Sequence, residues 1–301
     1  MKKAKYDPKM ATGIVVAGGT LGILIPPSGC LIMYGIITQQ SIGSLFIAGI
    51  IPGIVLASLF MLSIYIRGRI SPELCPRGPE TTLKEKFAAF GQCGEIIALL
   101  ILVLGGLMIG WFTPTEAGAV GAFGAIVISL LRRRISTGGF KDAIRHTAKT
   151  TGMIYFILIG AFILNYFMTV STIPDKLASI VSGLPLPSLA IIGIIVLIYM
   201  VLGCFIDAAA MTLLTVPIFF PMILSMGYDP IWFGIIVVVV SEMAMITPPV
   251  GMNVYAISGI AQDVPMHQIF RGIIPFFLVM LCFVIILIIF PQIALFLPNL
   301  L

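Results

Sequence analysis

The chain has 301 residues, of which 59% are hydrophobic and 10% are charged, and its net charge of +5 comes from 17 basic and 12 acidic residues. Soluble domains are about half apolar and about a quarter charged, so this composition excludes a soluble domain and indicates a polytopic membrane protein. The basic residues lie in short loops without interleaved aromatic residues, which argues against a nucleic-acid partner. The cysteines lack C-x-x-C spacing and the two histidines flank different apolar runs, so no transition-metal site is expected.

Residues 1–66 are predicted to contain a broken helix over 9–38 and a membrane span over 42–66. About 20 helical residues cross the hydrocarbon core of a bilayer, and both segments are long enough. The first is interrupted by "LIPPSGC" at residues 24–30. A crossing helix, rather than a re-entrant hairpin, places the N-terminal lysines in the cytoplasm, as the positive-inside rule prefers.

Residues 67–150 are predicted to form a cytoplasmic loop, two connecting spans and an amphipathic arm. The loop, 67–90, carries five basic residues. The two spans are separated by Thr113-Pro114-Thr115-Glu116, which has the spacing of a helix-capping box. The arm, 140–150, has the amphipathic pattern of a helix that lies along the membrane interface.

Residues 151–301 are predicted to hold a span, a re-entrant hairpin, a second broken helix and a last span. The hairpin is expected to turn at about Cys204–Ala208, and the second broken helix is interrupted by "ITPPVGM" at residues 246–252. The four predicted segments are 151–173, 188–225, 230–262 and 272–296.

The two Pro-Pro-x-Gly motifs belong to an internal repeat. Tyr6-Asp7-Pro8 matches Tyr228-Asp229-Pro230, and Pro26-Pro27 matches Pro248-Pro249, both at an offset of 222 (228 − 6; 248 − 26). "GIIP" at 49–52 recurs at 272–275. Since loop charges place the two copies in opposite membrane orientations, the pattern indicates an inverted-repeat secondary transporter.

The proline pairs suggest an ion site. Proline lacks an amide hydrogen, so Pro-Pro leaves backbone carbonyls unpaired, and glycine permits a sharp turn. The alternative is a simple kink in a packed helix. Asp207, at the predicted hairpin turn, is expected to neutralise a bound cation, and the alternative is an ordinary helix cap. Glu242 is either a coupling group or a packing group, and the candidate substrate-binding residues are Asn253, Thr212 and Ser28.

Four stretches of the sequence are characteristic of one family: "YDPKMATGIVVAGGTLGILIPPSG", "GWFTPTEAGAVGA", "GCFIDAAAMTLLTVPIFFPM" and "SEMAMITPPVGMN". Through them the sequence resembles the large membrane subunits of tripartite ATP-independent periplasmic (TRAP) transporters for C4-dicarboxylates and sialic acid. The resemblance covers essentially the whole chain.

The resemblance implies an elevator-type fold and sodium-coupled uptake of an organic acid in the bacterial inner membrane. It also implies two partners, a periplasmic substrate-binding protein and a small four-helix membrane subunit. No cofactor is implied besides Na⁺. Carried over by motif, the sodium-binding residues are Gly22, Ile25, Pro26 and Ser28 at the first break, and Gly203, Asp207, Thr247, Val250 and Gly251 at the second.

One departure from the family affects these expectations. Family members are longer at the N-terminus, where they carry the first hairpin, so we expect an N-terminally truncated architecture whose first cation site does not close without another segment. The alternatives are a non-transporting fragment, a structural membrane partner or an intramembrane enzyme. Sequence evidence for the enzyme is weak, because Asp229 is predicted at the outer surface and no Gly-x-Gly-Asp motif occurs.

Overall fold

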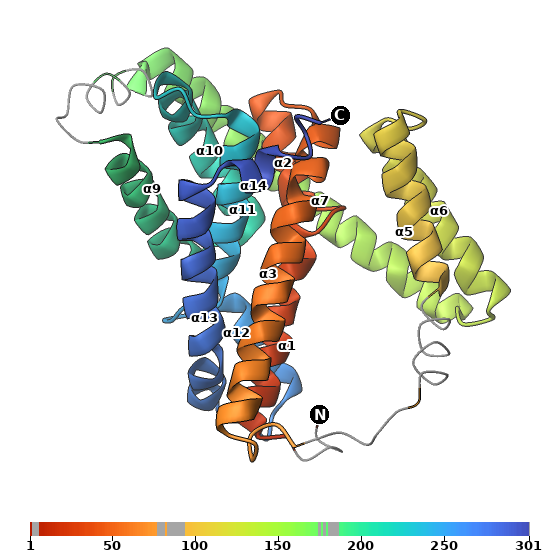
Figure 1. The fold of residues 1–301 in the computed structure, drawn as a ribbon. Helices are drawn as coiled ribbons and strands as arrows, with labels where there is room; N and C mark the ends of the chain where they lie inside the picture. The colour runs from red at the N-terminus through yellow and green to blue at the C-terminus, as the bar shows by residue number, and fades with distance from the viewer. Residues whose placement is uncertain are drawn as a thin grey trace. The chain divides into compact units, whose positions relative to one another are not determined.

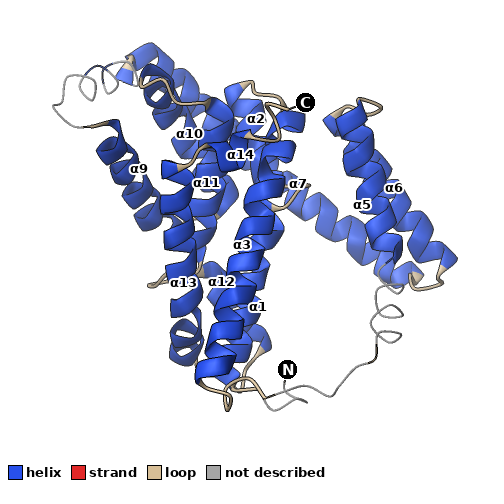
Figure 2. Ribbon diagram, in the orientation of Figure 1, coloured by secondary structure: helices blue, strands red, loops and turns tan. Residues whose placement is uncertain are grey.

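The protein is helical in every element that the computed structural model describes (Figures 1 and 2). The described residues are 1, 6–76, 82, 94–173, 176, 179 and 187–300. Six helical segments among them, counting Pro8–Thr38 as one, are long and apolar enough to cross a membrane. The prediction of an all-α polytopic membrane protein is confirmed.

The helices divide between two compact units. Unit 1 comprises Met1–Arg77 and Ala161–Leu301, and unit 2 comprises Gly78–Gly160. Unit 2 holds α5 (Gly94–Ile109), α6 (Pro114–Leu131) and the first part of α7 (Thr137–Ser171). Unit 1 holds the end of α7 and the remaining helices, which are α1 (Pro8–Leu24), α2 (Gly29–Thr38), α3 (Ile42–Ile70), α9 (Ser188–Gly203), α10 (Ala208–Ser225), α11 (Pro230–Met245), α12 (Met252–Ile260), α13 (Met266–Ile289) and α14 (Gln292–Leu295).

Several helices begin where the sequence supplies a side-chain cap. Asp7 and Asp229 each accept two backbone N–H groups and precede a proline at the first position of α1 and α11. In unit 2, Thr113 and Glu116 form the predicted capping box: Glu116 N donates to Thr113 Oγ1 at 3.3 Å, and Thr113 N donates to Glu116 Oε2 at 2.8 Å. These caps fix the helix starts locally.

The segment around residue 150 differs from the sequence prediction. The arm over 140–150 and the span over 151–173 were expected as separate elements, but α7 is one helix from Thr137 to Ser171. No proline lies between the polar first half and the apolar second half. Backbone hydrogen bonding therefore continues across the change in polarity, because hydropathy alone does not end a helix.

The end of the chain also has different bounds. The last span was predicted over 272–296, but α13 runs from Met266 to Ile289 and the short α14 follows. Pro291, the N-cap residue of α14, cannot continue the hydrogen-bonded ladder of α13. The prediction of a separate last helix holds, while its boundaries shift toward the N-terminus.

Helix α11 forms the centre of the unit 1 core. Every residue from Trp232 to Met245 is buried, as expected for a helix that is apolar on all faces. The helix packs against α9, α10, α13 and α3, with α13 and α3 labelled beside it in Figure 1. The indole N–H of Trp232 donates to the Leu287 carbonyl oxygen at 2.9 Å and so ties α11 to α13.

Helices α1 and α13 approach each other through glycines. A Cβ atom placed on Gly13 would overlap the carbonyl oxygen of Gly272, and one placed on Gly272 would overlap that of Lys9. Only residues without side chains permit this backbone contact.

The contacts of the two broken helices correspond to one another. Helix α1 packs against α13 and α12, while α11 packs against α3 and α2. Each broken helix therefore contacts the helices that follow the other break. The internal repeat seen in the sequence has a counterpart in the packing.

Candidate functional site

The site begins at two helix breaks of the same design. Between α1 and α2 the break contains a cis peptide bond at Pro26-Pro27, and between α11 and α12 it contains one at Pro248-Pro249. Neither proline of a pair can donate to the carbonyl four residues earlier. At the first break this removes the α-helical donors for Gly22 and Ile23.

The same loss affects two carbonyls before the second break, those of Ala244 and Met245, whose partners would be Pro248 and Pro249. The Thr247 amide donates instead to the Ala244 carbonyl oxygen, at 3.0 Å. Gly251 then adopts a positive φ of 59° as the N-cap residue of α12. A residue with a side chain would be strained there.

The predicted sodium ligands of the first break differ in exposure. Pro26 and Ser28 are buried, whereas Gly22 and Ile25 are exposed. Ser28 is the N-cap residue of α2, and its Oγ accepts the Leu31 amide at 3.3 Å. The structure therefore gives Ser28 a capping role.

The first break packs closely against α3. A Cβ atom on Gly49 would lie 2.9 Å from the Leu24 carbonyl oxygen, and one on Gly53 would lie 2.7 Å from Ile25 Cγ1. The prediction that Gly22, Ile25, Pro26 and Ser28 bind sodium is not tested by this geometry.

The turn of the α9–α10 hairpin lies against the second break. Gly203, the last residue of α9, packs on Ala244 with no room for a side chain. The sulfur of Cys204 lies 3.2 Å from the Pro248 carbonyl oxygen and 3.1 Å from the Met200 carbonyl oxygen, and the single thiol hydrogen is shared between these two acceptors. The predicted turn at Cys204–Ala208 thus matches the structure, in which Cys204–Asp207 join the two helices.

Asp207 caps helix α10. Its Oδ1 accepts the amides of Ala209 and Ala210 at 3.0 and 3.1 Å, and the side chain is half-buried. Both bonds end on Oδ1, and no described residue donates to Oδ2. Asp207 therefore has a structural role as the cap of α10, which uses one of its two carboxylate oxygens. Asp229 caps α11 in the same way.

The remaining candidates lie near the same break. Thr247 is half-buried and donates to the Met243 carbonyl oxygen at 2.7 Å, and Val250 is exposed. Thr212 is fully buried and donates to the Ala208 carbonyl oxygen at 2.7 Å. Asn253 is half-buried in the first turn of α12, where its Nδ2 lies 3.5 Å from Glu242 Oε2. Its place makes Asn253 the most accessible of the three substrate-binding candidates.

The sequence did not indicate a contact for Cys204, and it left the role of Glu242 open between coupling and packing. Cys204 lies in an apolar run, where a thiol usually behaves as a small hydrophobe, and no local pattern shows that it faces a proline carbonyl 44 residues away. Glu242 is 1% exposed. Among the buried side-chain nitrogen and oxygen atoms of the described residues, only Glu242 Oε1 has no hydrogen-bond partner.

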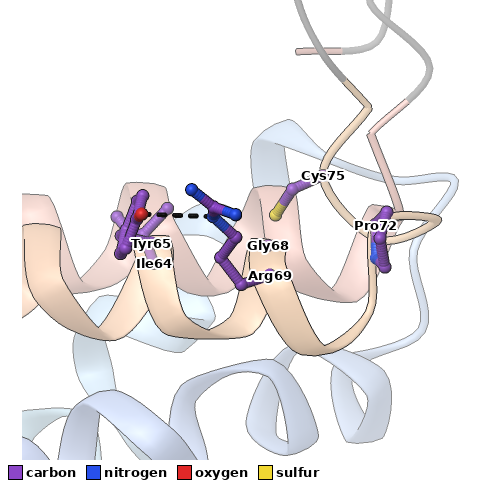
Figure 3. Close-up of a pocket in the computed structure, with 6 residues that line it drawn as sticks. All are labelled: Ile64, Tyr65, Gly68, Arg69, Pro72 and Cys75. Atoms are coloured by element: carbon purple, nitrogen blue, oxygen red, sulfur yellow. Dashed lines mark hydrogen bonds between the residues drawn. The ribbon is translucent and has the colours of Figure 1, made fainter.

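One cavity in unit 1 is separate from the breaks. Figure 3 shows it at the end of α3, lined by Ile64, Tyr65, Gly68, Arg69, Pro72 and Cys75, with Arg69 Nε donating to the Tyr65 hydroxyl at 3.1 Å. Its volume is about 550 Å³. Tyr65 follows Gly53, which meets the first break, by twelve residues, or about 18 Å of helix. The described residues hold no group of three or more His, Cys, Asp or Glu suited to a metal ion.

Comparison with known proteins decides the family. A family model described as "Tripartite ATP-independent periplasmic transporter, DctM component" matches residues 1–293. The chain belongs to the TRAP transporter large permease family. It is 36% identical over 300 residues to the C4-dicarboxylate TRAP transporter large permease protein DctM of Pseudomonas aeruginosa, covering 99% of this chain and 70% of that protein.

Two further relatives of this TRAP permease carry other substrates in their names. The sialic acid TRAP transporter large permease protein SiaM of Vibrio cholerae is 31% identical over 308 residues, covering 100% of this chain and 70% of that protein. The isethionate TRAP transporter permease protein DctMQ of Oleidesulfovibrio alaskensis is 32% identical over 302 residues, covering 98% of this chain and 46% of that protein. The family is shared, whereas the substrate varies among its members.

Proposed function

We propose that this TRAP permease is the membrane subunit of a sodium-coupled secondary transporter that imports an organic acid across the bacterial inner membrane. The substrate class follows the relatives, which are named for C4-dicarboxylates, sialic acid and isethionate. Because these relatives are permeases by name, we propose transport and not catalysis. A periplasmic binding protein would deliver the substrate, and a small membrane subunit would complete the complex.

The observation that carries the proposal is the contact between the hairpin turn and the second break. The Cys204–Pro248 hydrogen bond and the Gly203–Ala244 contact hold the loop with Asp207 against the segment with Thr247. Carboxylate, hydroxyl and carbonyl oxygens are the ligands that hard cations prefer. This arrangement supports sodium binding by Asp207, Thr247, Gly203, Val250 and Gly251.

The paired breaks support the architecture that the sequence predicted. The loss of α-helical donors at a proline pair is costly in a membrane unless protein, water or an ion satisfies the carbonyls. Proline pairs in two matched breaks, with corresponding helix contacts, favour an inverted repeat over two unrelated kinks. In this proposal the repeat forms the moving part of an elevator-type transporter, and its first sodium site uses Gly22, Ile25, Pro26 and Ser28.

Sodium binding can be tested on the purified chain in detergent. A cation that binds only the folded protein stabilises it, by about 2.7 kcal/mol at one hundred times its dissociation constant. We expect NaCl to raise the unfolding temperature more than equimolar KCl. Asp207→Asn should abolish this difference, because asparagine keeps the helix cap and removes the charge.

Asp229→Asn is the matched control, since Asp229 caps α11 with the same hydrogen bonds. It should keep the full sodium effect. Equal stabilisation by sodium and potassium in the unchanged protein would refute the sodium site. Transport itself is then measured as uptake of labelled succinate, sialic acid or isethionate by cells that also produce the binding protein and the small subunit, with and without sodium.

A further inference from the structure

Glu242 is a buried carboxyl group that neither the helix caps nor the sodium proposal explains. It lies in the last turn of α11 and is 1% exposed. Its Oε2 faces Asn253 Nδ2 at 3.5 Å, and its Oε1 has no hydrogen-bond partner among the described residues. Asn253 lies beyond the second break, so this contact joins the two helices that the break separates.

The surroundings of Glu242 offer no compensating charge in the described part of the chain. The charged residues of the helices that pack on α11 lie in the first two turns of α1 and α13 and in the last turn of α3. They are Lys9, Arg67, Arg69, His267 and Arg271, and none forms an ion pair with Glu242.

The other titratable groups on these elements do not supply a positive charge either. The Cys30 thiol on α2 lies within electrostatic range of Glu242 and Asp207. The hydroxyls of Tyr34 and Tyr199 are hydrogen-bonded to Pro230 and Thr215. The remaining groups are Tyr65, Cys204, Tyr255 and Cys282, all neutral side chains.

An ionised carboxylate in this place is strongly disfavoured. Burial of an unpaired charge costs far more than burial of a neutral polar group. The last turn of a helix also carries the negative end of its dipole, which repels an anion. Glu242 must therefore be neutralised by a bound cation, either a metal ion or a proton.

The geometry distinguishes these two cations. Hard metal ions need several oxygen ligands, whereas the polar group in contact with Glu242 is the amide nitrogen of Asn253, a hydrogen-bond donor that cannot bind a metal ion. A proton needs one oxygen. Asn253 donates to Oε2, which leaves Oε1 as the atom that carries the hydrogen. We propose that Glu242 binds a proton and forms a proton site next to Asn253, separate from the sodium site around Asp207 and Thr247.

This site deepens the proposed transport function by adding a second coupling ion. Loss of the proton would leave a buried carboxylate, so it requires water or another donor to reach Oε1. Because Glu242 and Asn253 lie on either side of the second break, a movement of α12 against α11 changes that access. The proton is therefore expected to be released when the break rearranges during transport.

Infrared spectroscopy tests the proton directly on the purified chain. A protonated carboxyl group has a carbonyl stretching band distinct from that of a carboxylate, and this band shifts in D₂O. We expect the unchanged protein to show the band at neutral pH and Glu242→Gln to lose it. Glu95→Gln is the matched control, because Glu95 is exposed and ion-paired with Arg132, and it should keep the band.

A band that persists in Glu242→Gln, or that is absent from the unchanged protein, overturns the proposal. Circular dichroism establishes that the variant is folded, and Glu242→Met provides a second neutral replacement of similar length. The sodium proposal fails or survives independently, since Asp207→Asn should keep the infrared band while losing sodium stabilisation. In uptake assays, Glu242→Gln should lose the dependence of transport on pH and keep that on sodium.

Discussion

The thiol of Cys204 donates a hydrogen bond to the carbonyl oxygen of Pro248, with 3.2 Å between sulfur and oxygen. Pro248 belongs to the second break, and Cys204 follows the last residue of α9. The bond therefore links a hairpin turn to a helix break that lies 44 residues further along the chain. This bond holds the turn of the α9–α10 hairpin against the second break.

Replacement of Cys204 should weaken the contact between the hairpin turn and the second break and lower the stability of the protein. Cys204→Ala removes a weak donor, and we expect a loss of about 0.5–1 kcal/mol in stability, which lowers the unfolding temperature by about 2 °C. Cys204→Ser keeps a donor and should lose less. Cys282→Ala is the control, because Cys282 is exposed. A similar loss in Cys282→Ala would show that the effect does not come from the bond to Pro248.

Added side chains should separate α1 from α13. Gly13→Ala and Gly272→Ala each force a methyl group against backbone, and overpacking of this kind costs about 1–3 kcal/mol. Gly18→Ala lies in the same helix with nothing near its Cβ position, so it should be neutral or stabilising by about 0.5–1 kcal/mol. Thermal unfolding of the three variants compares them. Equal unfolding temperatures for Gly13→Ala and Gly18→Ala would contradict the close backbone contact between α1 and α13.

The phenol of Tyr34 should hold the two repeats together. Its hydroxyl donates to the Pro230 carbonyl oxygen at 2.5 Å, joining α2 to the first turn of α11. Tyr34→Phe keeps the ring and removes this bond, at an expected cost of about 1 kcal/mol. Tyr65→Phe, at an exposed site, should cost less. The measurement is hydrogen exchange of the α11 amides, which should become faster in Tyr34→Phe alone.

The thiol of Cys75 should react slowly at neutral pH. Burial raises its pKa above the ordinary value, the nearby Arg67 guanidinium lowers it, and Asp7 raises it. Only the thiolate attacks a maleimide, so a raised pKa means less thiolate at a given pH and a labelling rate that increases as the pH rises.

Substitution of Arg67 or Asp7 tests the effect of each of these charges on the pKa of Cys75. Arg67→Gln removes a charge that lowers the pKa of Cys75 and should slow labelling further. Asp7→Asn removes a charge that raises this pKa and should speed labelling. Quantification of labelled Cys75 peptides over a pH series checks both. Shifts in the opposite directions would refute the assignment.

The local elements of this fold follow from short-range signals in the sequence. The caps at Asp7, Thr113 and Asp229 and the proline pairs define starts and breaks because backbone hydrogen bonding is decided within a few residues. The boundary at residue 150 was wrong because a change from polar to apolar sequence does not interrupt a helix.

The long-range contacts could not be predicted in this way. Nothing near Cys204 in the sequence indicates Pro248, and nothing near Glu242 shows that Asn253 is its neighbour. Such pairs depend on how distant helices pack. The sequence could therefore identify Asp207 as an unusual carboxylate in an apolar segment. The partial burial of Asn253, and the lack of a hydrogen-bond partner for Glu242 Oε1 among the described residues, are seen only in the structure.

The glycine contact between α1 and α13 limits the motions open to this protein. Where backbone rests directly on backbone, no layer of flexible side chains remains to absorb sliding, and even a methyl group would force the helices apart. Any displacement that carries the helix before the first break must then carry α13, and with it α12 and the second break. In the proposed transporter, opening and closing at each break can be local, whereas a movement of α1 across the membrane carries α13, α12 and the second break with it as one rigid body.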